Sequence, residues 1–416
     1  MRTNVSKQTT NSTNAVIKVI GIGGGGSNAV NRMMDAGIHG VEFIAMNTDL
    51  QVLERAKAPV RVQLGVSLTR GLGAGGNPEV GKSAAEESKN EIRKVVEGSD
   101  MVFITAGMGG GTGTGAAPIV ADLIRECGAL AVAVVTKPFT FEGPRRRKLA
   151  DQGIMSLMGR VDTMITIPND KLMNVVERKT TLTEAFRVAD DVLRQGVQGI
   201  SDIITIPGQI NVDFADVRAV MTNAGPALMG IGYGVGEDRA LQAAQTATSS
   251  PLLEQTINGA KGLLVNITSN ESLTLAEATK AMEYIHELCD SDDAAIYFGL
   301  VVDPEMGDEV RITVLATGFN PMGFANTTVT RTHATQPTYA VVQEPTPASP
   351  ATEVPEPTTT VSKISPQAEA ALKPLVSPKD IWQKAAADRT QNDPEEIFDE
   401  ADLDIPAFLR EKKTKS

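Results

Sequence analysis

The chain has 416 residues, of which 41% are hydrophobic, and a formal net charge of −12 at pH 7. This length allows two or three domains with a sizeable core. The acidic balance argues against a nucleic-acid-binding protein, which normally carries a basic face. Two cysteines and three histidines show no zinc-binding spacing. The N-terminus is polar, and no apolar run approaches the ~18 residues of a membrane-spanning helix. We therefore expect a soluble, cytoplasmic protein.

The first half of the chain alternates short apolar runs with stretches of helical length. Such alternation is typical of a parallel sheet built from βαβ units. We therefore predict an α/β fold with a Rossmann-like parallel sheet. The predicted strands are residues 16–20, 41–46, 101–105, 130–136 and 163–167.

Each predicted strand is followed by a loop of unusual composition. Because the carboxyl ends of parallel strands share one edge of a sheet, these loops should meet there. The sequence thus predicts one composite nucleotide site. The five loops are residues 21–28, 47–49, 109–115, 137–139 and 168–170.

Residues 109–115 read Gly-Gly-Gly-Thr-Gly-Thr-Gly, between a predicted strand and a predicted helix. The N–H groups of such a loop can point at an anion, and the helix N-terminus adds a partial positive charge. A flexible connector would also contain glycine. However, each ordered glycine costs roughly 0.5–1 kcal/mol relative to alanine, which favours a phosphate site.

Two further motifs match known nucleotide-binding patterns. Gly21, Gly23 and Gly26 match the dinucleotide fingerprint and Asp49 follows at the spacing of a ribose-binding acid, so an NAD-dependent oxidoreductase is the alternative function. Residues 76–83 match the P-loop pattern, but no strand precedes them and Pro78 lacks an amide N–H. We expect no P-loop there, although residues 71–77 could still border the phosphates.

A long amphipathic helix is predicted from Thr181 to about residue 204, with Thr181 and Glu184 as a capping box. Phe186 and Asp190 are four residues apart and share a face of this helix. They either belong to the core or stack on a base and accept its N–H groups.

Asp213 and Asp216 are three residues apart, so one helical turn would bring both carboxylates to the same side. A helix N-terminal cap over residues 211–213 explains the same pattern equally well. A second domain follows. Its predicted strands are 262–268, 295–302 and 309–316, and its predicted helices are 236–249 and 275–290.

From about residue 320 the composition changes to that of a linker. Ten of the 22 prolines fall within residues 321–380, among Thr, Ala, Ser and Gln. Such a segment cannot bury enough apolar surface to order itself. An acidic stretch then leads to Ile405, Phe408 and Leu409, a small apolar set typical of a partner-binding peptide.

Together these motifs resemble the tubulin-like GTPases, in particular the FtsZ family of bacterial cell division. The resemblance covers residues 15–319 and resumes at 403–410. It rests on residues 21–28, 47–49, 71–78, 109–115, 137–139, 168–170, 211–216 and 404–410.

The resemblance implies a site for GTP or GDP, with Glu142 at the ribose, Arg146 near the phosphates and Phe186 over the guanine. Asn169 and Asp190 would read the base, but many relatives carry Asn in place of Asp190. The adjacent Asp191 could take that role instead. The implied GTP-binding residues are Gly24, Gly25, Gly26, Ser27, Asn28, Asn47, Ala74, Gly75, Asn77, Gly110, Gly111, Thr112, Gly113, Thr114, Pro138, Glu142, Arg146, Asn169, Phe186 and Asp190.

The resemblance also implies that hydrolysis occurs between subunits. Asn211, Asp213 and Asp216 of the next protomer would complete the site, with Mg²⁺ offsetting phosphate charge. Head-to-tail filaments would then form the division ring at midcell beneath the inner membrane. A scaffold that polymerises without hydrolysis is the remaining alternative.

The tail would bind membrane adaptors such as FtsA and ZipA, and division regulators. Its implied contact residues are Asp404, Ile405, Pro406, Phe408, Leu409 and Arg410.

The expected organisation has six parts. They are an N-terminal segment (1–14), a GTP-binding domain (15–180), a central helix and connection (181–208), an activation and polymerisation domain (209–319), a linker (320–392) and a partner-binding tail (393–416).

Overall fold

The computed structural model describes residues 15–173, 180–206, 208–250, 253, 256–289 and 294–319. All of them belong to the first of two compact units of the chain, Met1–Val329. The predicted N-terminal segment, linker and tail lie outside the described residues.

A ten-stranded sheet runs through the described part, in the order β3-β2-β1-β4-β5-β6-β7-β10-β8-β9. The first six strands are parallel and follow the classic doubly wound order. The α/β prediction is therefore confirmed. The strands are β1 (Ile17–Ile22), β2 (Val41–Asn47), β3 (Val60–Gln63), β4 (Met101–Gly107), β5 (Leu130–Lys137), β6 (Thr163–Pro168), β7 (Gly225–Gly234), β8 (Gly262–Ser269), β9 (Ala295–Val302) and β10 (Val310–Thr317).

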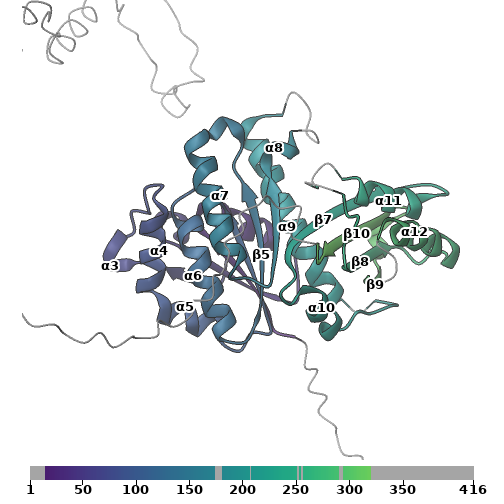
Figure 1. Cartoon of the computed structure of the whole chain (residues 1–416), viewed down its shortest axis with the longest axis horizontal. Coiled ribbons are helices and arrows are strands. Elements are labelled where there is room, and N and C mark those ends of the chain that lie inside the picture. The colour runs from purple at the N-terminus through teal and green to yellow at the C-terminus, as the bar shows by residue number, and fades with distance from the viewer. Residues whose placement is uncertain are drawn as a thin grey trace, which may run out of the picture. The chain divides into compact units, whose positions relative to one another are not determined.

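Helices cover both faces of the parallel part (Figure 1). Side chains alternate along each strand, so Val132 and Val134 face the cluster that includes α9, whereas Ala133 and Val135 face the opposite cluster. The helices are α1 (Gly23–Asp35), α2 (Leu50–Glu54), α3 (Val66–Thr69), α4 (Pro78–Glu87), α5 (Lys89–Val96), α6 (Thr112–Glu126), α7 (Pro144–Met158), α8 (Asn169–Leu172), α9 (Leu182–Thr205), α10 (Phe214–Met221), α11 (Arg239–Thr248) and α12 (Leu275–Leu288), with short 3₁₀ turns η1 (Thr140–Glu142) and η2 (Pro304–Met306).

The long helix α9 begins as predicted. The Thr181 hydroxyl accepts a hydrogen bond from the Glu184 N–H, and the Glu184 carboxylate accepts one from the Thr181 N–H at 2.8 Å. Its buried side joins the core through Leu193, Val197 and Ile200. In Figure 1, α9 lies between β5 and β7, where the parallel part of the sheet meets the mixed part.

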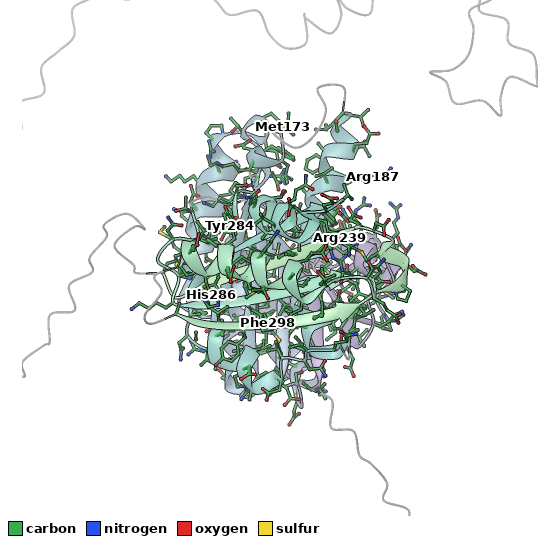
Figure 2. The ribbon with its side chains drawn as sticks, turned by 90° about the vertical axis from the view of Figure 1, so that its right-hand side faces the viewer. Met173, Arg187, Arg239, Tyr284, His286 and Phe298 are labelled. Carbon is green, nitrogen blue, oxygen red and sulfur yellow. The ribbon has the colours of Figure 1, made fainter. Side chains whose placement is uncertain are left out.

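In the mixed part, β7 pairs with β6 in parallel but with β10 antiparallel, and β8 pairs with β9 in parallel. Helices α11 and α12 pack against this region, joined by the buried Arg239. Its guanidinium donates to Glu277 at 3.0 Å and to Ser272 at 2.9 Å. Figure 2 labels Arg239, on α11, and Phe298, on the edge strand β9.

Strands β3 and β7 were not predicted from the sequence. β3 is only four residues long and has a single buried residue, which leaves little apolar signal. β7 carries several glycines, which are rare in strands because they offer no side chain to pack. A Cβ at Gly230, Gly232 or Gly234 would lie 1.9–2.0 Å from a carbonyl oxygen of α11. These glycines therefore let α11 rest directly on the strand.

Within the described ranges, no helix combines the length and apolar character needed to cross a bilayer.

Candidate active site

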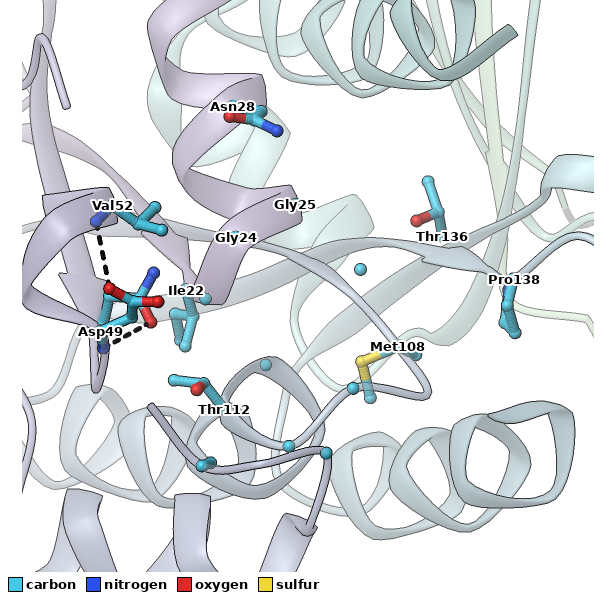
Figure 3. Close-up of a pocket in the computed structure, with 18 of the residues that line it drawn as sticks. Ile22, Gly24, Gly25, Asn28, Asp49, Val52, Met108, Thr112, Thr136 and Pro138 are labelled. Carbon is cyan, nitrogen blue, oxygen red and sulfur yellow. Dashed lines mark hydrogen bonds between the residues drawn. The ribbon is translucent and has the colours of Figure 1, made fainter. Parts of the chain in front are cut away.

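A cavity of about 620 Å³ opens at the carboxyl edge of the parallel strands (Figure 3). All five loops predicted from the sequence to meet at this edge contribute to the wall of the cavity. Residues that follow β1, β2, β4, β5 and β6 line it, together with side chains from α9. The volume suits a nucleotide-sized ligand.

One end of the cavity is formed by two helix N-termini. α1 begins at Gly23 and α6 at Thr112, and neither first turn carries an acidic residue. The N–H groups of a first turn have no partner within the helix, so they and the helix dipole favour an anion. A Cβ at Gly25 would lie 3.2 Å from the Gly107 nitrogen, so the two loops approach each other closely. This end is therefore suited to an anionic group such as a phosphate.

The loop between α3 and α4 closes the phosphate end. Gly73, Gly75 and Gly76 have positive φ angles and line the cavity. The Gly73 N–H donates to the Thr48 carbonyl at 3.2 Å, and the Thr48 hydroxyl lies 2.7 Å from that of Thr112. Loops that follow different strands are thus tied to one another around the same space.

The P-loop pattern of residues 76–83 has another explanation in the structure. Its second glycine, Gly81, lies inside α4, and a Cβ there would lie 2.3 Å from the Gly111 carbonyl oxygen. Gly81 therefore allows α4 to pack against the glycine loop from behind, and it does not line the cavity.

The other end of the cavity is formed by α9 and α8. Phe186, Asp190 and Leu193 line it from α9, and Asn169 lines it from α8. The Phe186 ring meets Phe139 edge to face, with 5.5 Å between centroids. This end presents an aromatic surface beside side chains that can accept hydrogen bonds.

Two buried amide atoms on the cavity wall have no protein partner within the described residues. They are Asn47 Nδ2 and Asn169 Oδ1. An unsatisfied buried polar atom costs about 1–3 kcal/mol, so such atoms are rare unless something else bonds them. A ligand with an acceptor for Asn47 and a donor for Asn169 would satisfy both, as a nucleotide can.

Glu142 and Arg146 line the cavity beyond Pro138. The Glu142 carboxylate accepts a hydrogen bond from the Phe139 N–H at 3.0 Å and forms an ion pair with Arg146. The neighbouring Arg147 instead contacts Asp170 at 3.2 Å. Of these two arginines, Arg146 is the one that faces the cavity.

Asn211, Asp213 and Asp216 do not line this cavity. Asp213 caps α10 by accepting a hydrogen bond from the Asp216 N–H at 2.8 Å, and Asn211 accepts one from the Gly208 N–H at 2.6 Å. This hydrogen bond shows that Asp213 is the N-cap of α10, as one of the two interpretations of the sequence predicts.

Helix α10 lies at the amino edge of the sheet. Arg218 donates to the carbonyl of Asp100, just before β4, at 3.2 Å, and Thr163 at the start of β6 donates to Met221 at 2.6 Å. The seven residues of β4 span roughly 20 Å, so the cavity and α10 are separated by the length of the sheet. In Figure 1, α8 lies near the top of the coloured ribbon and α10 near the bottom.

Comparison with known proteins identifies the family. Residues 16–177 match the tubulin/FtsZ family, GTPase domain, and residues 225–320 match the FtsZ family, C-terminal domain. An empty FtsZ dimer from M. jannaschii is 45% identical, covering 75% of this chain and 90% of its own, with a TM-score of 0.71. The chain belongs to the FtsZ family.

A mutant FtsZ from M. jannaschii is 47% identical over 74% of this chain and 92% of its own, with a TM-score of 0.71. A GTPγS-bound protofilament of CetZ2 from Haloferax volcanii is 19% identical over 72% of this chain and 92% of its own, with a TM-score of 0.61. The CetZ2 similarity shows a shared fold. Membership in a family of GTPases removes the basis for the NAD-dependent alternative.

Most residues that the FtsZ resemblance assigns to nucleotide binding line the cavity. They are Gly24, Gly25, Asn28, Asn47, Ala74, Gly75, Gly110, Gly111, Thr112, Gly113, Pro138, Glu142, Arg146, Asn169, Phe186 and Asp190.

Gly26, Ser27, Asn77 and Thr114 lie behind the wall instead. A Cβ at Gly26 would lie 2.3 Å from the Thr105 carbonyl oxygen, and Ser27 is buried. Asn77 caps α4 by accepting from the Glu79 N–H at 3.1 Å, and the Thr114 hydroxyl accepts from the Gly109 N–H at 2.8 Å. In this structure they shape the loops without facing the cavity.

The structure separates the two candidate base-reading carboxylates. Asp190 lines the cavity, whereas Asp191 does not and is bonded to Arg194 at 2.6 Å and to Gln195 at 2.7 Å. Burial would raise the pKa of Asp191, but the Arg194 guanidinium and Gln195 outweigh burial and lower that pKa.

Several lining residues were missed by sequence reasoning. Ala189 and Leu193 lie on the same face of α9 as Phe186, three and seven residues on, so helical spacing could have found them. Met108 and Thr136 had no such signal.

Proposed function

We propose that this protein binds GTP in the cavity and hydrolyses it only where a second copy supplies Asn211, Asp213 and Asp216. The observation that carries the proposal is the placement of the cavity and this acidic loop at opposite edges of one sheet. A single chain cannot bring them together, but two copies stacked head to tail can.

The carboxylates inside the cavity support the same conclusion. Asp49 accepts hydrogen bonds from the Gln51 and Val52 N–H groups at 2.9 and 3.3 Å. Glu142 and Asp190 pair with Arg146 and Arg32. Each of these carboxylates already has a contact within its own chain, which leaves Asp213 and Asp216 of a second copy as the better candidates to polarise a water molecule.

Guanine fits the acceptors at the α9 end. Its Watson–Crick edge carries two adjacent donors, N1–H and the 2-amino group, which a carboxylate such as Asp190 can accept together. Adenine presents an acceptor at N1 and would oppose the same carboxylate. Phe186, half-exposed at this end, provides a surface for stacking.

Magnesium is compatible with the phosphate end. Among the described residues no group of three or more His, Cys, Asp or Glu could hold a metal alone. Mg²⁺ on a nucleotide needs no such group, because it keeps several waters and binds through phosphates with one or two protein oxygens. The Asp49 carboxylate and the Thr112 hydroxyl, both on the wall, are the oxygens available. When bound, the ion would offset the phosphate charge.

In the proposed mechanism the glycine N–H groups at the starts of α1 and α6 hold the phosphates. Asp213 and Asp216 of the neighbouring copy then orient and polarise the attacking water, beside Asn211. A contact between two different surfaces of the same chain repeats without closing, which produces an open filament. The FtsZ structure from M. jannaschii that is described as a dimer agrees with self-association.

We extend the proposal to the division ring at midcell. The tail residues 404–410 would bind membrane adaptors of the FtsA and ZipA type, which would hold the filaments beneath the inner membrane. The family match supports a role in cell division, and the apolar set in the tail supports a partner.

A mixing experiment tests the shared site. Gly24→Val should block the cavity, since a Cβ at Gly24 meets no protein atom within 4 Å and therefore projects without displacing the wall. Asp213→Ala should leave the cavity intact and remove the catalytic carboxylate.

Each variant alone should release little phosphate from GTP, and their mixture should recover part of the turnover. Recovery requires that one copy provides the cavity and another provides Asp213. A mixture as inactive as its components would contradict a shared site.

A further inference from the structure

Arg32 is an arginine outside the cavity whose side chain reaches a residue inside it. Its Nε donates to Asp190 Oδ2 at 3.0 Å, although the two residues are 158 positions apart in the chain. The Asp190 side chain is 14% exposed and that of Arg32 35%. Arg32 does not line the cavity, and Asp190 is the lining residue to which it is hydrogen-bonded.

The pairing leaves half of the carboxylate available. Arg32 bonds Oδ2, and within the described ranges no protein donor contacts Oδ1. A bidentate arginine would occupy both oxygens, whereas this single contact orients the carboxylate and leaves Oδ1 for a ligand on the cavity side.

Burial and Arg32 act in opposite directions on Asp190. Burial raises the pKa of the Asp190 carboxyl, and the hydrogen bond and charge of Arg32 offset part of that rise. A neutral carboxyl would present an O–H donor as well as an acceptor, which suits the N6 amino group and N1 of adenine. An ionised one presents acceptors only, which suits guanine.

Other charged groups around this part of α9 are engaged elsewhere. Asp191 pairs with Arg194 on α9 itself, and on α8 Asp170 pairs with Arg147. On α1, Asp35 pairs with Lys57. Lys137 at the end of β5 lies outside the cavity lining.

The two ends of α1 connect this pair to the phosphates. The helix starts at Gly23 on the phosphate side and carries Arg32 in its last turn. Nine residues of helix span about 13 Å. One rigid element thus positions both the phosphate-binding N–H groups and the group that orients the base-reading carboxylate.

We propose that Arg32 is a positioning residue that gives the site its preference for guanine, by holding Asp190 as an oriented carboxylate. This inference rests on the proposed binding of GTP. It predicts that the choice between GTP and ATP depends on a residue that touches neither nucleotide.

The test is equilibrium binding of GTP and ATP to the full chain, measured by competition with a fluorescent GTP analogue below the concentration at which filaments form. Arg32→Met keeps an unbranched apolar stem of similar length and removes the charge. The matched control is Arg194→Met, which removes the partner of Asp191 one turn further along α9.

In Arg32→Met we expect the ratio of GTP to ATP affinity to fall by roughly tenfold near pH 6.5, as for a lost hydrogen bond to a charged group. The ratio should recover toward pH 8.5, because a carboxyl whose pKa has risen ionises again at higher pH. Arg32→Lys, which retains the charge, should restore most of the ratio at both pH values, and Arg194→Met should not change it.

An unchanged ratio at both pH values in Arg32→Met would overturn the inference, as would an equal loss at both, which a purely structural role would cause. If Arg32→Met does not fold, Arg32→Gln gives the same readout. A native chain that binds ATP as tightly as GTP would refute the proposed function itself.

Discussion

The proposed mechanism gives Asp213 two roles, one structural and one catalytic, and a single substitution can separate them. Its carboxylate caps α10 through the Asp216 N–H, and in the proposed mechanism it also polarises water at the neighbour's nucleotide. Asparagine is as good a helix cap as aspartate but carries no charge. The choice of substituent therefore distinguishes a structural role from a catalytic one.

Asp213→Asn should keep the stability of the chain and its affinity for GTP, and should lose about 10²-fold or more of its GTP turnover. Asp213→Ala should lose the same turnover and about 1 kcal/mol of stability from the missing cap. Phosphate release and urea unfolding measure the two effects. The exposed Asp151→Asn on α7 serves as the control, and normal turnover in Asp213→Asn would leave Asp213 with the cap alone.

A second aspartate on α9 predicts a pH effect on stability. Burial raises the pKa of Asp202 to about 6, against the opposing charge of Arg311, whose Nη2 lies 4.0 Å from its carboxylate. Since the folded pKa lies above the unfolded value of 3.8, the neutral carboxyl is favoured by folding. Its contribution to stability is complete below about pH 4 and is lost as the pH rises through 6.

The contribution of Asp202 to the free energy of unfolding should therefore fall between about pH 4 and pH 7, and Asp202→Asn should remove this fall of about 2 kcal/mol. Urea unfolding at the two pH values measures it. Asp308→Asn, at an exposed carboxylate, is the control. The same pH dependence in Asp202→Asn and in the native chain would contradict the assignment.

At the scale of elements, the contact between β7 and α11 depends on glycine. The carbonyl oxygens of α11 occupy the space where side chains of β7 would lie. Packed interiors cannot absorb an overlap between backbone atoms without moving a whole element. A single added methyl group on one of these glycines would therefore force α11 and β7 apart.

Gly232→Ala should destabilise the chain by about 2–3 kcal/mol or more, because its Cβ would lie 2.0 Å from the Ala243 carbonyl oxygen. Thermal unfolding is the measurement. Gly159→Ala, whose Cβ meets nothing within 4 Å and whose φ is −77°, should be tolerated. Equal melting temperatures for the two variants would refute the packing argument.

The same contact explains the limits of prediction from sequence. Capping residues such as Thr181 and Glu184 act locally, so the start of α9 could be predicted. The glycines of β7 are required by a helix that follows it, and they remove the apolar signal that marks a strand. The FtsZ resemblance implies that Thr114 contacts the nucleotide, but in the structure its hydroxyl accepts a hydrogen bond from the Gly109 N–H. The pairing of Arg32 with Asp190 spans 158 residues and left no pattern to read.

At the scale of the whole molecule, the tail should work independently of the nucleotide site. The cavity and α10 lie within residues 15–319, whereas the predicted partner-binding peptide lies beyond a proline-rich segment. Removing residues 403–416 should abolish binding to a membrane adaptor and leave GTP turnover unchanged. Pull-down and phosphate release measure the two, and deletion of residues 340–353 within the linker is the control. Loss of both activities on removing the tail would mean that its role has been misread.

Turnover should also depend on protein concentration. Below a threshold concentration, isolated chains should hold GTP without hydrolysing it, and above that threshold the rate should rise with the concentration of assembled chains. Phosphate release across a dilution series, compared with sedimentation in GTP and in GDP, measures this. A rate per chain that is constant at every dilution would contradict a shared site.

The placement of the cavity and α10 at opposite edges of the sheet has a consequence for the number of complete active sites in a filament. In the proposed filament the number of complete sites would be one fewer than the number of chains, because the chain at one end would hold GTP with no neighbour to complete its site. The rate of phosphate release would then be proportional to the number of contacts between chains, and short filaments would have the lowest rate per chain. Breaking a filament in two would inactivate one site, so the mean filament length could be inferred from the rate of phosphate release per chain.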